Sequence, residues 1–197
     1  MKMYTNIPND FNRVKCELVD TIGVFSSGTP IENWVFQNSA ASYLPIGVVL
    51  GASESFNSQV TEYARFKITG VSVTAVMCNS PEHVRALFAN GSPGACVAFY
   101  PQNTTQSMGV SPRTKDNNFV IYPNVTAKQS KYWSIPDNYV DNGAGGLGVW
   151  LSTNISTTGV TGQLAICGLE GGNTSSGSLN VYLLRVCVYV IFSTKLD

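Results

Sequence analysis

The sequence predicts an all-β protein, a sandwich or barrel of antiparallel strands, and two observations carry this prediction. Apolar segments rich in Val, Ile, Tyr, Phe and Thr recur at short intervals along the 197 residues. Clusters of Gly, Pro, Asn and Ser separate these segments, as turns separate strands. The length fits one domain, and the sequence contains neither heptads nor an internal repeat.

Eight segments have the character of strands, and they span residues 31–37, 43–51, 61–78, 94–101, 118–133, 145–153, 160–169 and 178–194. We interpret residues 1–30 as an N-terminal arm that leads into the domain, and residues 31–197 as the domain itself. One short helix is predicted over 81–88, because Pro81 suits a first helical position and Ser80 can cap it.

Segment 61–78 contains the clearest strand, and the strand carries an irregularity. Before Gly70, the apolar residues Phe66 and Ile68 share one face. After Gly70, the apolar pattern moves by one position, to Val71 and Val73. A shift of one residue at a glycine predicts a β-bulge at this point.

The last segment is apolar on both faces from Val181 to Phe192, with Arg185 as the exception. A strand with one wet face alternates between apolar and polar residues, whereas a strand covered on both sides does not. We therefore expect another layer or another subunit to cover the outer face of this strand. The residues expected at such a subunit interface are Tyr182, Leu184, Val186 and Tyr189, together with Trp133.

The composition limits the classes of protein that the chain can represent. Twelve Lys and Arg balance twelve Asp and Glu, and only 12% of the residues are charged, about half the usual ~25%. A neutral surface with few charges favours association rather than repulsion. We expect no membrane span and no signal peptide, because no apolar run is long enough. The five dispersed cysteines are interpreted as reduced thiols, and the four that lie in apolar segments (Cys78, Cys96, Cys167 and Cys187) are expected to be buried.

The sequence offers no catalytic constellation, so we expect no enzyme, no cofactor and no metal centre. A triad would have to use His83, the single histidine, which falls on the predicted helix. The glycine-rich run 143–148 lacks the Lys and Ser/Thr of a phosphate loop and is interpreted as a loop before a strand. Asp137 and Asp141 flank a turn. Carboxylates in such a position can bind a hard cation, but we favour the alternative that they accept hydrogen bonds from nearby backbone N–H groups.

The basic residues occur in small groups and are the candidates for contact with nucleic acid. Two residues that lie two apart on a strand point the same way, and tyrosines and tryptophans nearby can stack on bases. The alternative is that these residues are solvated charges or interface charges. The candidates are Arg13, Lys15, Arg65, Lys67, Lys128 and Lys131, with Tyr63, Tyr132 and Trp133 as the nearby aromatic residues.

Three segments resemble the coat proteins of small icosahedral viruses. The segment EYARFKITGVSVTAVMCNSP (62–81) resembles a coat-protein strand in which basic and aromatic residues precede a β-rich run and a turn. The segment GSLNVYLLRVCVYVIFST (177–194) resembles the closing strand of the same proteins, and AKQSKYWSIPD (127–137) resembles an internal strand that runs into a turn. The similar coats are those of circovirus-like, satellite-virus and tombusvirus-like particles.

This resemblance implies a fold and a function. It implies an eight-stranded antiparallel jelly roll whose sheets, BIDG and CHEF in the usual strand lettering, pack face to face. It implies a structural protein that assembles inside the host cell into the closed shell of a virion, with about sixty copies in a T=1 particle. The partners implied are further copies of this chain, single-stranded nucleic acid, and a host receptor of unknown identity.

One feature departs from the coat-protein pattern, which commonly includes a strongly basic N-terminal arm. In residues 1–30, three basic and three acidic residues cancel: Lys2, Arg13 and Lys15 against Asp10, Glu17 and Asp20. Counterion release by such an arm cannot drive packaging of a genome. We therefore expect weak contact with nucleic acid through the small basic groups, or neutralisation of the genome by another protein.

An alternative function is a lectin-like or TNF-like trimeric jelly-roll module that binds sugars. In that case the tryptophans, or tyrosines in loops, would contact the ligand. The candidate tryptophans are Trp34, Trp133 and Trp150.

Overall fold

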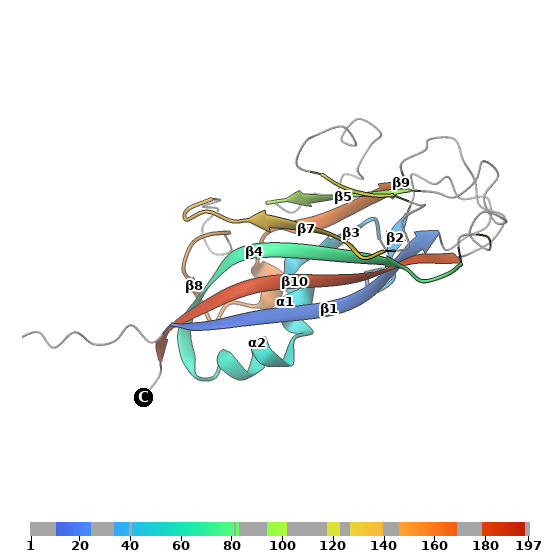
Figure 1. The fold of residues 1–197 in the computed structure, drawn as a ribbon. Coiled ribbons are helices and arrows are strands. Elements are labelled where there is room, and N and C mark those ends of the chain that lie inside the picture. Colours follow the sequence, from blue (N-terminus) through green and yellow to red (C-terminus); the bar gives the residue numbers. More distant parts are fainter. Residues whose placement is uncertain are drawn as a thin grey trace, which may run out of the picture.

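The computed structural model describes residues 11–24, 34–39, 41–80, 82, 94–101, 118–122, 127–139, 146–168 and 179–195. These residues form two antiparallel sheets that pack against each other (Figure 1). The long sheet contains β1 (Asn12–Val24), β10 (Leu179–Lys195), β4 (Tyr63–Met77) and β7 (Gln129–Ser134), with β2 (Val35–Phe36) and β8 (Leu151–Ser152) at its margins. The short sheet contains β3 (Tyr43–Pro45), β9 (Gln163–Gly168), β5 (Ala95–Tyr100) and β6 (Phe119–Ile121).

The strand order is that of a jelly roll. The long sheet has the order β2-β1-β10-β4-β7, and the short sheet has the order β3-β9-β5-β6. Once the two-residue strands β2 and β8 are set aside, the remaining strands take the letters B to I in chain order. The two sheets then read BIDG and CHEF, which confirms the all-β, jelly-roll prediction. The described residues hold ten strands rather than eight, because the two short strands extend the long sheet.

The core lies between the sheets and is built around the inner face of β10. From Tyr182 to Phe192, the residues with even numbers on this strand point inward, because side chains alternate along a strand. Phe192 contacts Phe56 and Phe66 in an aromatic cluster, with ring centroids 5.6 and 6.1 Å apart. Tyr182 packs against Trp34 at 5.9 Å. Both ends of the strand are therefore anchored by aromatic contacts.

This alternation corrects the predicted subunit interface. Tyr182, Leu184 and Val186 are fully buried within the single chain, and Trp133 is nearly so. They form the core between the two sheets and have no surface to offer to another subunit. Tyr189 alone of the predicted set lies on the outer face of the long sheet, where it is partly exposed.

The interpretation of residues 1–30 as an arm is also corrected. Within this range, β1 spans Asn12–Val24 and pairs with β10 along its whole length and with β2 near its end. Val14 and Leu18 pack against the core, whereas Arg13 and Lys15 on the other face are exposed. The polar residues therefore belong to the wet face of a sheet strand rather than to a free segment.

The helices differ from the prediction of one short helix. The described residues contain α1 (Ile46–Gly51), α2 (Glu54–Gln59) and the 3₁₀ turn η3 (Thr157–Gly159). Of the strand predicted over 43–51, only Tyr43–Pro45 is strand, because Ile46, Val49 and Leu50 recur at helical spacing and are buried. The predicted helix 81–88 lies outside the described residues except for Glu82.

Two further segments are shorter than predicted. Segment 118–133 contains two strands, β6 and β7, rather than one. In segment 145–153 only β8 is strand, and Gly148 before it has a φ of +74°, a conformation that favours glycine. Among the described residues, no helix is long and apolar enough to cross a membrane.

The β-bulge predicted near Gly70 is confirmed. Along β4 the buried positions change from Phe66 and Ile68 to Val71 and Val73. Tyr189 of β10 pairs with Gly70, while the next residue, Val190, pairs with Ile68, so the register skips Thr69. The bulge keeps apolar residues on the inner face along both halves of this long strand.

The burial pattern of β10 predicts opposite outcomes for two neighbouring leucines. Leu184→Ala should lower the free energy of unfolding by about 2–5 kcal/mol, because it leaves a cavity in the core. Leu183→Ala is the matched control: this side chain is 41% exposed, and its loss should cost within about 0.5 kcal/mol. Urea unfolding of the two variant chains measures both values. Equal costs would contradict the assignment of faces.

Candidate functional site

The outer face of the long sheet carries the clearest concentration of functional side chains. On β1 this face presents the odd-numbered residues, which alternate with the buried ones. Cross-strand pairs on one face are neighbours. Arg13 lies opposite Ile191 of β10, which in turn lies opposite Lys67 of β4. Lys15 lies opposite Tyr189 in the next row. Basic residues from two strands that are distant in the sequence, β1 and β4, thus lie on one surface.

Positive charge exceeds negative charge on this face. Among the described residues, its two acidic side chains are Glu17 and Asp137. The six basic ones are Arg13, Lys15, Arg65, Lys67, Lys128 and Arg185, so six minus two leaves four positive charges. The chain as a whole has no net charge. The fold therefore sorts a balanced composition into a basic surface, which attracts anions.

Some of these cations are held in ion pairs. Glu17 lies between Lys15, at 3.1 Å, and Arg185, at 3.0 Å. The hydrogen bond from Lys15 lowers the pKa of the Glu17 carboxyl, and the same bond raises the pKa of Lys15. Lys67 contacts Asp137 at 2.7 Å and lies 5.1 Å from the ring centre of Trp150.

Arg13 and Arg65 are exposed, and neither has a carboxylate partner among the residues that the structure describes. A guanidinium presents a planar set of N–H donors that matches a phosphate or a carboxylate. These two arginines are therefore the cations on the face that are most available to an anionic ligand.

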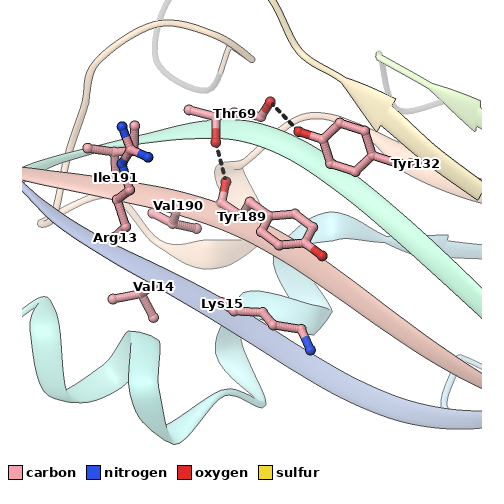
Figure 2. A pocket seen from close by; sticks show the side chains of 8 residues that line it. All are labelled: Arg13, Val14, Lys15, Thr69, Tyr132, Tyr189, Val190 and Ile191. Atoms are coloured by element: carbon pink, nitrogen blue, oxygen red, sulfur yellow. Dashed lines mark hydrogen bonds between the residues drawn. The ribbon is translucent and has the colours of Figure 1, made fainter.

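A pocket of about 630 Å³ opens on this face beside the bulge. Its lining is Arg13, Val14, Lys15, Thr69, Tyr132, Tyr189, Val190 and Ile191 (Figure 2). The rings of Tyr132 and Tyr189 meet edge to face, with centroids 5.6 Å apart. Tyr132 is 52% exposed, so part of its ring is open to a ligand.

Both tyrosines are held by hydrogen bonds to β4. The Tyr132 hydroxyl donates to the carbonyl oxygen of Thr69 at 3.5 Å. The Tyr189 hydroxyl and the Ser72 hydroxyl lie 3.3 Å apart and share a hydrogen bond. The Thr69 hydroxyl donates to the Tyr189 carbonyl oxygen at 3.3 Å, which ties the bulged residue to β10.

Gly70 makes this arrangement possible. A Cβ atom at this position would lie 2.2 Å from the Tyr132 hydroxyl oxygen and 2.6 Å from the ring carbon that bears it. Because glycine lacks a Cβ, the ring of Tyr132 can lie across β4 and reach Thr69. The glycine that marks the bulge in the sequence thus also shapes the pocket.

The structure brings together most, but not all, of the predicted basic residues. Lys128 lies toward the other end of the face, in a second hollow with Arg185 and Leu183. Lys131 alternates with Tyr132 along β7 and shares its strand face with Trp133, so it lies away from the others. Of the predicted aromatic residues, Tyr63 and Trp133 belong to the core.

The sequence analysis missed two residues of this face. It did not include Arg185 among the basic candidates, and it did not predict that Tyr189 lines a pocket. The signal was present in the alternation of β10. Both residues have odd numbers, whereas the residues that pack in the core from Tyr182 to Phe192 have even numbers. The strand is apolar enough on both faces to hide this pattern.

The structure describes only some of the other residues that the sequence singled out. Asp137 bonds to Lys67, while Asp141 and His83 lie outside the described residues. No group of three His, Cys, Asp or Glu suited to a metal ion occurs in the part of the chain that the structure describes. Of the four cysteines predicted to be buried, Cys96, Cys167 and Cys187 are buried, whereas Cys78 is exposed, contrary to the prediction.

Comparisons with known proteins identify the fold. No protein-family model matches the chain, and no curated protein matches it in sequence. A structure of Desmodium yellow mottle tymovirus is similar with a TM-score of 0.51 and 11% identity, over 100% of this chain and 89% of that one. A T=1 subviral particle of a Penaeus vannamei nodavirus capsid protein deletion mutant gives 0.53 and 11%, over 94% and 98%.

A third structure, the T=3 Penaeus vannamei nodavirus, gives a TM-score of 0.60 and 12% identity, over 100% of this chain and 58% of that chain. These proteins share the jelly-roll fold of viral capsids. The chain therefore has the fold of the capsid proteins of small icosahedral viruses, as the sequence resemblance implied.

The contact between Gly70 and Tyr132 predicts a non-additive pair of substitutions. Gly70→Ala should lower the free energy of unfolding by about 1–3 kcal/mol, because the new methyl group collides with the Tyr132 ring. In a Tyr132→Ala background the same change should cost much less. Denaturant unfolding of the four chains measures the coupling. Equal costs in both backgrounds would show that the ring does not lie over Gly70.

Proposed function

We propose that this chain is a viral capsid protein that self-assembles into a small icosahedral shell. The observation that carries the proposal is the BIDG and CHEF strand order, and the similarity of the fold to capsid structures along nearly the whole chain supports it. The low charge content also supports assembly, because uncharged surfaces lose little solvation when they pack together. Its role is structural rather than enzymatic.

The shell is proposed to be a T=1 particle of about sixty copies, formed inside the host cell and retained as the virion. A closed arrangement suits a jelly roll because neighbouring copies can cover sheet edges that would otherwise be exposed. The similarity to a chain that forms a T=1 subviral particle supports this size. The T=3 particle among the similar structures is the main competing geometry.

The outer face of the long sheet is proposed to contact single-stranded nucleic acid enclosed by the shell. The concentration of basic side chains on this face, against two acidic ones, supports the proposal. The excess of about four charges per subunit is small, so each contact is weak. Many copies on one closed inner surface would make the total binding strong.

Electron microscopy of the protein expressed alone tests the proposed assembly. We expect uniform closed particles, because identical interfaces repeat around symmetry axes. The same preparation measured by light scattering gives the mass in solution. A single 21.2 kDa species across a range of salt concentration and pH would overturn the proposal. A trimer that binds glycans would instead favour the lectin-like alternative.

Arg65 and Lys131 form a matched pair for testing the basic face. Arg65→Ala should weaken binding of a single-stranded oligonucleotide and reduce the slope of log K against log salt by about 0.7, the value for one phosphate contact. Lys131→Ala removes the same charge from the opposite face of β7 and should leave the slope unchanged. Fluorescence anisotropy across a salt series measures both. Equal effects of the two substitutions would show that the oligonucleotide does not bind preferentially to the outer face of the long sheet.

A further inference from the structure

The pocket beside the bulge is more specialised than a basic surface requires. Its two tyrosines are fixed before any ligand arrives, because both hydroxyls bond to β4 and the rings contact each other. A preorganised aromatic surface loses little entropy on binding. The half-exposed ring of Tyr132 therefore offers a ready stacking surface for a planar group.

Cations border this aromatic surface on one side. Arg13 and Lys15 come from β1, two positions apart on the same face, and both line the pocket (Figure 2). Arg13 has no carboxylate partner among the described residues, whereas Lys15 is held by Glu17. An anion at this border would meet one available guanidinium and a second, nearby ammonium group.

The chemistry of the lining selects among possible ligands. A planar ring beside a negative group is the chemistry of a nucleotide, whose base stacks and whose phosphate pairs with arginine. The lining contains no Asp, Glu, Asn or Gln side chain to bond the hydroxyl groups of a sugar. The volume of about 630 Å³ lies within the range of about 300–1,000 Å³ typical of small-molecule pockets.

We propose that this pocket binds one nucleotide of a single-stranded nucleic acid, with the base against Tyr132 and Tyr189 and the phosphate at Arg13 and Lys15. The inference rests on the proposed function, because the nucleic acid is the one that the shell encloses. The strand is single because a base within a duplex does not expose its flat face. Since both tyrosine hydroxyls already make hydrogen bonds within the protein, we expect the pocket to discriminate little between different bases.

Two substitutions separate stacking from charge. Tyr132→Ala should weaken binding of a labelled ten-nucleotide strand about tenfold while the salt slope stays constant, because stacking releases no counterions. Arg13→Ala should weaken binding and lower the slope by about 0.7. Tyr132→Phe keeps the ring and should bind nearly as the unchanged chain does. Tyr122→Ala removes an exposed tyrosine beyond β6, in the short sheet, and is the matched control.

The measurement is fluorescence anisotropy on the full chain in its dissociated form, with oligo-dT and oligo-rU as separate probes. Urea unfolding of each variant verifies that it is folded. Both probes should bind, with the same ranking of variants. The proposal is overturned if neither probe binds, if Tyr132→Ala binds within twofold of the unchanged chain, or if Tyr122→Ala has an equal effect.

The outcomes also separate this proposal from the proposed function. If particles form and Tyr132→Ala leaves oligonucleotide binding intact, the nucleotide pocket is wrong and the shell remains. If no particles form and the variants rank as expected, the shell is wrong and the pocket remains. Variant particles provide a second readout, because loss of the pocket should lower the ratio of absorbance at 260 nm to that at 280 nm.

Discussion

The structure depends on the register of β10 between β1 and β4. This strand of 17 residues is hydrogen-bonded on both sides, and its inner face is the centre of the core. A slip of one residue would move Tyr182, Leu184 and Val186 to the outer face and bring Arg185 into the core. Because inner and outer positions alternate along most of the strand, the same pairing that builds the core also determines which side chains face outward.

The bulge opposite Tyr189 links this register to the candidate site. A long strand twists, and an extra residue allows its two halves to keep their apolar side chains on the core. Here the extra residue is Thr69, whose hydroxyl donates to the Tyr189 carbonyl oxygen and whose carbonyl oxygen accepts from the Tyr132 hydroxyl. Gly70, which has no side chain, leaves space for the Tyr132 ring over the sheet. The bulge that keeps apolar side chains on the core along a twisted strand thus also lies beside the pocket on the outer face.

Charge is arranged by the same geometry. The chain carries equal numbers of basic and acidic residues, yet basic side chains gather on the outer face of one sheet. Net charge alone would have assigned this protein no attraction for a polyanion. The proposed contact with nucleic acid depends on the charge of this one face rather than on the net charge of the chain.

The sequence by itself determined the all-β class, most of the long strands and the bulge, because the two-residue period and the glycine that interrupts it are local features. It did not reveal that β1 belongs to the sheet or which face of β10 is buried, since both follow from pairing between residues more than 150 positions apart. Only the tertiary structure placed Arg13, Tyr132 and Tyr189 around one pocket. They come from three strands, and no local pattern records which strands become neighbours.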